Sequence, residues 1–125
     1  MRFARREAQE TNATFVSLSS QNAFDRLLTA SAEEPVILFK HDDACSISMY
    51  AYRELAAVPG DVFLIDVERD HDLSQSLATQ LGVEHESPQV IVVRDGRPVY
   101  TASHWEISRD EVRRAAGREI AGAGE

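Results

Sequence analysis

Two short apolar runs constrain the fold of this chain most strongly. Residues 36–39 and 62–67 are rich in Val, Ile, Leu and Phe and lack the alternation of polar and apolar residues that a half-exposed strand shows. Continuous apolar strands are typical of a sheet that helices cover on both faces. We therefore expect residues 36–39 to form a central strand and residues 62–67 another buried strand.

Helical patterns separate these strands. Ser20 is predicted to cap one helix, a second helix is expected over residues 45–57, and a third is expected to begin at Asp72 or Ser74 and to end at Gly82 in a left-handed cap. Each pattern has apolar residues at helical spacing. These positions are Ala23, Phe24, Leu27 and Leu28 in the first helix, Ile47, Met49, Tyr50, Ala51 and Leu55 in the second, and Leu73, Leu77 and Leu81 in the third.

The carboxyl-terminal part reads as a hairpin followed by one more helix. Residues 89–101 form two strand segments around an Asp-Gly turn at residues 95–96, a dipeptide that favours tight hairpins. A final amphipathic helix is predicted over residues 108–121. Ser108 is expected to cap it, and Glu111, three residues later, to complete a capping box.

Length and order indicate one α/β domain. A chain of 125 residues with 43% hydrophobic content is long enough to bury about two-thirds of its unfolded surface. With a first strand at residues 15–18, the order is β-α-β-α-β-α-β-β-α, which predicts a central mixed sheet flanked by helices. We assign residues 14–121 to this domain and expect residues 1–13, which are polar and charged, to be a flexible or frayed tail.

Charge and composition argue against several classes of partner. A net charge of −8 opposes binding to nucleic acid or to an anionic membrane, since both select for basic patches. No run of about 18 apolar residues spans a bilayer, and the basic amino terminus lacks the apolar segment of a secretory signal. An unpaired thiol fits a reducing compartment, so the expected location is cytoplasmic.

The only cysteine, Cys45, lies between the predicted strand at residues 36–39 and the following helix. The thiolate is the attacking species in thiol–disulfide exchange, and the free N–H groups at a helix start favour negative charge. Without a second cysteine, any oxidised form must be capped by a small thiol, another protein or oxygen. The sequence thus indicates a monothiol mechanism or, if Cys45 is an inert packing residue, no redox role. A metal site is not expected, because the histidines show no paired ligand spacing.

Several short segments resemble known families. Cys45 at a helix start, Ser87-Pro88 before the hairpin and the Asp-Gly turn are similar to the thioredoxin superfamily, in which Pro88 would be a cis-proline. Over about residues 14–115 the chain more closely resembles the monothiol bacilliredoxin family. The resemblance implies a thioredoxin-like fold with a cysteine at a helix N-terminus and a cis-proline loop. The segments that carry it are Phe39-Lys40-His41, Cys45-Ser46-Ile47-Ser48, Ser87-Pro88-Gln89 and Ala102-Ser103-His104-Trp105.

The resemblance also implies a reaction. Cys45 would attack a mixed disulfide between a client protein and bacillithiol, or a comparable low-molecular-weight thiol, so that the client is freed and Cys45 carries the small thiol. Ser48 stands where dithiol relatives have a resolving cysteine, so a second thiol or a reductase must restore the enzyme. The expected partners are S-thiolated client proteins and a small thiol or reductase, with bacillithiol as co-substrate and no tightly bound cofactor.

Residues around the cysteine are candidates for binding. Lys40 and His41 would favour the thiolate or bind an anionic thiol, the loop at Pro88 would expose main-chain groups to an extended substrate, and His104 with Trp105 would form a wall of the thiol pocket. Each also has a purely structural interpretation, as a strand end, a turn or a packing residue. The predicted thiol- and substrate-binding residues are Lys40, His41, Ser46, Ser48, Ser87, Pro88 and His104.

Three departures from the family pattern keep other functions open. Ser46 replaces the usual proline of Cys-Pro-Ile-Ser, which removes a preset φ and adds an N–H near the sulfur. Asp42 and Asp43 oppose a thiolate unless one of them caps the helix. Phe39 stands where thioredoxins carry a buried acid. A non-catalytic thioredoxin-fold binding or adaptor module and a thiol redox sensor therefore remain as alternatives.

Overall fold

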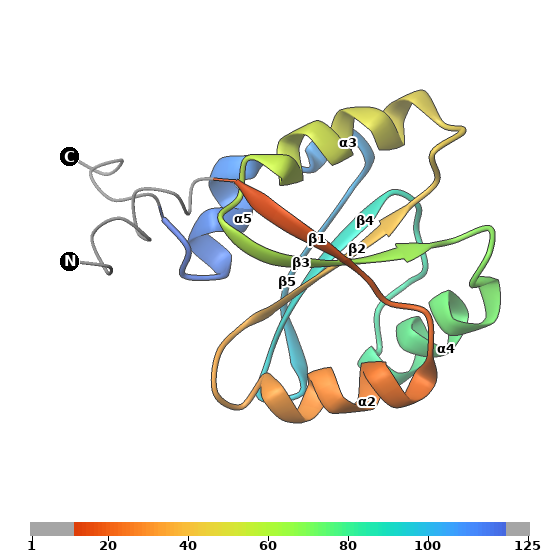
Figure 1. Cartoon of the computed structure of the whole chain (residues 1–125), viewed down its shortest axis with the longest axis vertical. Helices are drawn as coiled ribbons and strands as arrows, with labels where there is room; N and C mark the ends of the chain where they lie inside the picture. The colour runs from red at the N-terminus through yellow and green to blue at the C-terminus, as the bar shows by residue number, and fades with distance from the viewer. Residues whose placement is uncertain (1–11, 120–125) are drawn as a thin grey trace.

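A five-stranded mixed sheet forms the centre of the protein in the computed structural model, which describes residues 12–119 (Figure 1). The strand order is β1-β3-β2-β4-β5. β1 and β2 pair in parallel with β3, whereas β4 pairs antiparallel with both β2 and β5. β2 is therefore the central strand, as predicted. The strands are β1 (Ala13–Ser17), β2 (Val36–His41), β3 (Gly60–Asp66), β4 (Gln89–Arg94) and β5 (Arg97–Ser103).

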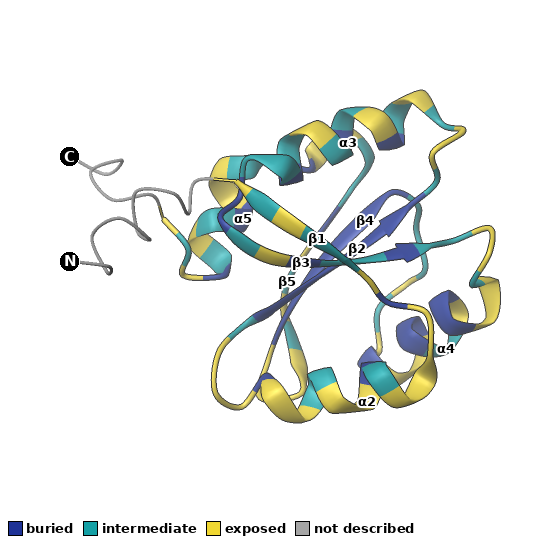
Figure 2. Ribbon diagram, in the orientation of Figure 1, coloured by how far each residue is buried: buried dark blue, intermediate teal, exposed yellow. Residues whose placement is uncertain are grey.

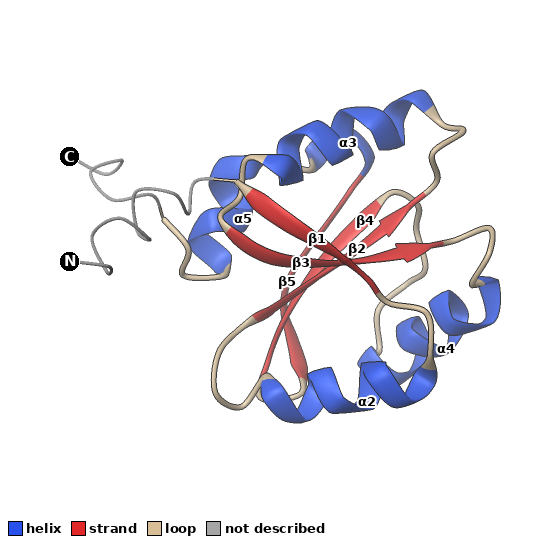
Figure 3. Cartoon of the chain, viewed as in Figure 1, coloured by secondary structure: helices blue, strands red, loops and turns tan. Residues whose placement is uncertain are grey.

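Helices cover both faces of this sheet. Figure 1 shows α3 and α5 over one face and α2 and α4 over the other, and Figure 3 shows how helices alternate with the first strands of the chain. A short 3-10 turn, η1, follows β5. The helical segments are α2 (Gln21–Ala30), α3 (Ser46–Ala56), α4 (His71–Leu81), η1 (His104–Glu106) and α5 (Arg109–Ala115).

The core has two layers, one on each face of β2. All six residues of β2 are buried, and Figure 2 shows the buried centre of the sheet. Ile37 and Phe39 belong to the apolar cluster beneath α3 and α5, whereas Val36 and Leu38 belong to the cluster beneath α2 and α4. Side chains of a strand alternate between the two faces of a sheet. The next two residues of β2, Lys40 and His41, therefore also point to opposite faces.

Local capping and turn signals predicted from the sequence are present. The Ser20 side chain accepts a hydrogen bond from the Ala23 N–H at the start of α2, and Gly82 ends α4 with φ +70°. Asp95 and Gly96 both have positive φ, 53° and 74°, as a tight hairpin turn requires. These signals act over four residues or fewer, which explains why the sequence alone predicts them.

The start of α4 differs from the prediction. The helix begins at His71 with Asp70 as its N-cap, so the expected start at Asp72 or Ser74 is wrong. Asp70 makes no side-chain capping bond, because its carboxylate pairs with Arg69 at 2.7 Å. The sequence signal for a capping side chain therefore pointed to residues that lie inside the first turn.

The last helix is shorter than predicted. α5 ends at Ala115, and the expected continuation towards residue 121 is wrong because Gly117 takes a left-handed φ of +65°. At its start, the Ser108 hydroxyl accepts from the Glu111 N–H at 3.5 Å. The Glu111 carboxylate accepts a hydrogen bond from a tyrosine of β5 instead of completing the capping box.

The ends of the predicted domain lie mostly outside the described part of the chain. Of the expected tail, residues 1–13, only Asn12 and Ala13 are described, and Ala13 opens β1. Residues 120 and 121 also lie outside. Among the described residues, no helix is both long and apolar enough to cross a membrane.

Candidate functional site around Cys45

Cys45 is the N-cap residue of α3. Its backbone is extended (φ −111°, ψ 127°), its carbonyl accepts the first helical hydrogen bond from the Met49 N–H at 3.1 Å, and its side chain makes no capping bond. The thiol is free and half-buried, and no acidic residue lies in the first turn of α3. The first N–H groups of a helix lack intrahelical partners and carry the positive end of the dipole. Cys45 thus stands at the start of α3, and its side chain makes no bond to the first N–H groups of the helix.

Asp42 shapes the turn that leads to Cys45. Its carbonyl accepts a hydrogen bond from the Cys45 N–H at 3.0 Å, and its carboxylate Oδ1 accepts one from the Ala44 N–H at 3.0 Å. Asp43, the neighbouring carboxylate, is exposed. The sequence left open that one of these two residues caps the helix. Asp42 instead closes the preceding turn, and Cys45 itself occupies the capping position.

His41 and Ser48 join the end of β2 to the first turn of α3. The His41 Nδ1 lies 2.8 Å from the Ser48 Oγ, and the same oxygen accepts a hydrogen bond from the Asp42 N–H at 2.9 Å. Ser48 is completely buried and His41 is 8% exposed. The residue in the position of a resolving cysteine is therefore an internal hydrogen-bonding residue of the β2–α3 connection.

The His41 ring lies among aromatic side chains. Its centroid is 5.2 Å from those of Phe39 and Tyr52, and Tyr52 stacks on Phe15 at 4.4 Å. Burial lowers the pKa of His41, while the carboxylates of Asp43, Asp42 and Asp66 oppose that shift. The ring is therefore neutral near pH 7, and one ring nitrogen bonds the serine hydroxyl.

Lys40 points away from the face that α3 covers. It is completely buried, and its Nζ lies 2.9 Å from the His85 Nδ1 in the connection between α4 and β4. Because side chains alternate along β2, Lys40 lies on the α2 and α4 face while His41 lies on the α3 face. The role of Lys40 in binding the thiol stays a prediction, and the contact that the structure gives its Nζ is to His85.

The Ser87–Pro88 segment meets the end of β5. Its peptide bond is cis, and the Pro88 carbonyl accepts a hydrogen bond from the His104 N–H at 3.1 Å. His104 has a left-handed φ of +57°, and its Nε2 lies 3.7 Å from Glu86 Oε1. In the β2–β4 pairing, Gln89 is opposite the residue before His41, so Pro88 is next to the strand end that leads to Cys45.

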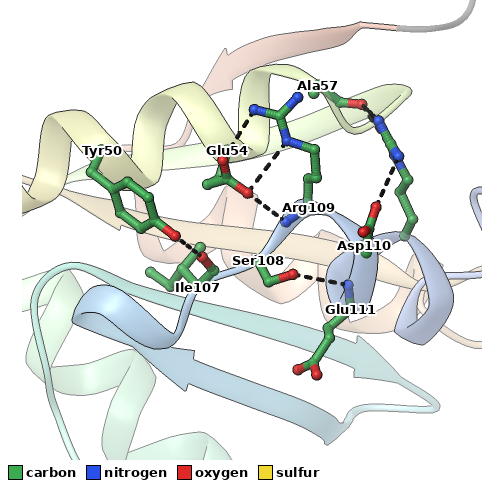
Figure 4. Close-up of polar contacts among 9 residues, drawn as sticks. Tyr50, Glu54, Ala57, Ile107, Ser108, Arg109, Asp110 and Glu111 are labelled. Carbon is green, nitrogen blue, oxygen red and sulfur yellow. Dashed lines mark hydrogen bonds and ion pairs between the residues drawn. The ribbon is translucent and has the colours of Figure 1, made fainter.

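An aromatic pair connects η1 to α3. Trp105 is 62% exposed, and its ring centroid lies 5.0 Å from that of Tyr50 on α3. The Tyr50 hydroxyl donates to the Ile107 carbonyl at 3.0 Å (Figure 4). Met49, the first residue after the opening turn of α3, is also exposed. Met49 and Trp105 are thus both exposed, and Trp105 contacts α3 through Tyr50.

An ion pair fixes the opposite part of α3. Arg109 donates to both carboxylate oxygens of Glu54, at 3.3 and 3.0 Å, and its backbone N–H donates to the same carboxylate at 3.0 Å (Figure 4). These bonds from Arg109 hold the pKa of Glu54 below its usual value, although burial opposes the shift. Arg113 adds hydrogen bonds to the Ala57 carbonyl. The helix that carries Cys45 is therefore anchored to α5.

The structure separates the predicted site residues into three places. His41, Ser46 and Ser48 adjoin Cys45, and Lys40 lies on the other face. The third group is at the adjoining ends of β4 and β5: Ser87, Pro88 and His104. The sequence analysis missed His85, because its partner Lys40 is 45 residues away in the chain and no local motif indicates the contact. Within residues 12–119, no three His, Cys, Asp or Glu side chains are grouped to hold a metal ion.

Known structures with the same architecture are thioredoxin-like. One, described as a proposed oxidoreductase with a thioredoxin fold, is 28% identical at a TM-score of 0.72, over 81% of this chain and 92% of that chain. The Malassezia sympodialis thioredoxin is 12% identical at 0.60, over 85% and 90%. An N21Q mutant thioredoxin from Halobacterium salinarum is 20% identical at 0.59, over 89% and 93%. The last two similarities concern the fold alone.

The sequence itself matches a family of single-cysteine redox proteins. Residues 16–112, which include Cys45, Pro88 and His104, match the family model described as monothiol bacilliredoxin BrxC. The lone cysteine of the chain is consistent with a monothiol. The chain therefore belongs to the monothiol bacilliredoxin family, and its function is in thiol redox chemistry on a thioredoxin fold.

Proposed function

We propose that this protein removes bacillithiol, or a similar low-molecular-weight thiol, from protein mixed disulfides through Cys45. The Cys45 thiolate attacks the sulfur of the small thiol, so that a new disulfide forms between them. The client–thiol disulfide breaks, and the client sulfur leaves with the electron pair and takes up a proton. No net oxidation occurs, because one disulfide replaces another.

The observation that carries this proposal is the position of Cys45 as an N-cap without a side-chain capping bond. Aspartate, asparagine, serine or threonine at an N-cap uses its oxygen to accept from the first N–H groups. Cys45 makes no such bond, so no capping bond has to break before its sulfur attacks a disulfide, with the thiolate as the nucleophile. A cysteine kept only for packing would need neither the helix terminus nor partial exposure.

Restoration of the enzyme requires an external thiol. Ser48 cannot form a disulfide, and its hydroxyl is already bonded to His41 and to the Asp42 N–H. A second small thiol or a reductase must therefore attack the Cys45 mixed disulfide. Client proteins and this reductant are the partners that the reaction demands.

Residues on the exposed side of the site are proposed to bind the small thiol and the client. Ser46 is exposed in the first turn of α3 and can donate its N–H or hydroxyl to the bound thiol. His104 is half-buried beside Glu86 and reaches the same end of the sheet as Ser87 and Pro88. His41 contributes by holding Ser48 and the turn, since its side chain is buried.

Intact-mass measurement of transfer tests the proposal. The reduced protein is incubated at neutral pH with a client protein capped by bacillithiol, and in parallel with clients capped by glutathione or coenzyme A. We expect rapid adduct formation on the native protein, release of free client, and no adduct on a Cys45→Ser variant. The mass of the adduct identifies the thiol that the site prefers.

Each alternative function predicts a different result. An adaptor module would form no adduct with any capped client while the unfolded chain reacts normally, and Cys45→Ser would bind clients as the native protein does. A redox sensor would form one adduct but not turn over when excess small thiol is supplied. Multiple turnovers with release of client at each cycle would exclude both.

A further inference from the structure

Lys40 is the only lysine of the chain, and it is completely buried. Of the 13 Lys and Arg residues, the other twelve are arginines. Arginine is always charged in proteins, whereas a lysine can lose its proton when it is buried. The only lysine of this protein thus lies inside the fold, beside the proposed site.

Lys40 makes its contact to the segment that precedes the cis-proline. Its Nζ lies 2.9 Å from the His85 Nδ1, and the Ser74 Oγ of α4 lies 3.4 Å from the same nitrogen. Three elements therefore meet at one imidazole: β2 through Lys40, α4 through Ser74, and the α4–β4 connection through His85 itself.

Side chains, rather than backbone bonds, hold this connection. The backbone–backbone hydrogen bonds described for residues 12–119 include none from or to residues 84–87. The Glu84 carbonyl accepts from the Gln89 Nε2 at 2.9 Å, and the Gln89 Oε1 is buried without a partner. Because Gln89 is paired with Lys40 across β2 and β4, this unused acceptor lies on the same face as the ammonium group.

The two partners have complementary protonation states near neutral pH. Burial lowers the pKa of Lys40 to about 8, opposed by Glu86, so the amine is mostly charged at pH 7. Burial, Lys40 and His71 lower the pKa of His85, also opposed by Glu86, so the imidazole is neutral. A charged donor therefore faces a neutral acceptor, which is the stronger kind of hydrogen bond.

We propose that Lys40 and His85 form a latch that positions residues 84–88, and with them Ser87 and Pro88, beside the strand end that leads to Cys45. Lys40 and His85 are then positioning residues for thiol exchange. This positioning role rests on the proposed function. The β2–β4 pairing gives the physical path: Lys40 and His41 are adjacent on β2, and one holds the pre-proline segment while the other holds Ser48 and the turn before Cys45.

The latch is sensitive to pH in both directions. Protonation of His85 removes the acceptor nitrogen and places a second cation beside Lys40, so the latch opens as the pH falls through the lowered pKa of His85. Loss of the Lys40 proton above about pH 8 removes the charge from the hydrogen bond and weakens it. Glu86 from the same connection and His71 from α4 are the other charged or titratable groups that act on this pair.

The His104 amide reports the position of the latch. It donates to the Pro88 carbonyl, so displacement of residues 84–88 exposes it to hydrogen exchange. We expect Lys40→Met to accelerate exchange at His104 about 10- to 100-fold, the factor for loss of a charged hydrogen bond. The Leu18 amide, which donates to Leu64 on the far side of the sheet, is the internal control and should not change.

A second measurement isolates positioning from thiol reactivity. This measurement is the rate of exchange with a capped client divided by the rate of Cys45 alkylation by iodoacetamide. Both rates depend on the fraction of Cys45 that is thiolate, so this fraction cancels in the ratio. In the native protein this ratio should fall as the pH is lowered from 7 through the lowered pKa of His85, and it should fall again above about pH 8; in Lys40→Met it should be low and flat. His85→Gln keeps a neutral acceptor for Lys40, so it should match the native ratio at pH 7 and lose the decline at low pH.

The outcomes separate the latch from the proposed function. Unchanged His104 exchange in Lys40→Met overturns the latch, whatever the activity. Faster His104 exchange with an unchanged rate ratio overturns the positioning role. If the native protein exchanges with no capped client, the proposed function fails, and the His104 amide still decides whether the latch exists.

Discussion

Removal of the Ser48 hydroxyl tests the connection between β2 and the helix that carries Cys45. This oxygen accepts from the Asp42 N–H at 2.9 Å and lies 2.8 Å from the His41 Nδ1, and the side chain is completely buried. Alanine leaves both groups without that partner. A buried polar group that loses its partner costs about 1–3 kcal/mol. Because Asp42 is only half-buried and regains water, we expect Ser48→Ala to lower the free energy of unfolding by about 2 kcal/mol.

Urea unfolding with a matched control measures this effect. Ser46→Ala removes an exposed hydroxyl from the same turn of α3 and should change the free energy of unfolding by less than about 0.5 kcal/mol. The two variants should have the same m-value, since they expose the same surface on unfolding. Equal stability of Ser48→Ala and Ser46→Ala would refute the argument that the hydroxyl holds the turn.

Three further predictions concern charge and backbone conformation. Glu54→Gln should lower the free energy of unfolding by about 1–2 kcal/mol at pH 7, because Arg109 bonds the carboxylate. The folded-state pKa of Glu54 lies below its usual value, so the difference in unfolding free energy between the native protein and Glu54→Gln should shrink as the pH falls below about 4.5. Urea titrations that give the same difference at pH 3 as at pH 7 would contradict this prediction. As the pH rises from 8 to 10.5, the unfolding free energy of the native protein should increase relative to that of Lys40→Met. Folding lowers the Lys40 pKa from 10.5 to about 8, so the unfolded chain binds more protons in this range. Parallel pH profiles of the two proteins would refute this. Gly82→Ala should cost about 1 kcal/mol in thermal unfolding through its φ of +70° alone, because nothing lies within 4 Å of the added Cβ; a neutral result would mean that the backbone shifts.

Elements with short-range chemical causes were predictable from the sequence. Ser20 caps α2 through a residue three positions away, and Gly82 and the turn at Asp95 and Gly96 need positive φ that few other residues adopt. Helix ends at which several neighbouring residues could serve as the cap were not predictable from the sequence. Asp70 precedes α4 although its carboxylate bonds Arg69. The chain leaves β3 through a turn in which the Asp66 carboxylate accepts from the Glu68 and Arg69 N–H groups, and the helix begins directly after that turn.

The site was predictable only in part for a similar reason. The position of Cys45 at a helix start follows from the order of strands and helices. Its proposed role follows from the chemistry of its sulfur atom. The roles of Lys40 and His85 depend on which face of β2 each side chain takes and on a contact between distant segments. A run of buried residues conceals that alternation, because all six residues of β2 are buried. The polar residues at the end of such a strand can thus be assigned to a face only once the sheet is known.

Cysteine at the N-cap of α3 also makes this helix start a point of compromise between stability and reactivity. A serine or aspartate at an N-cap contributes about 0.5–2 kcal/mol through its capping bond, and Cys45 makes none. The Cys45→Ser protein should therefore unfold at a higher urea concentration than the native one. Under the proposed function, the sulfur is needed here for thiol exchange, although an oxygen at the same position would make the helix more stable.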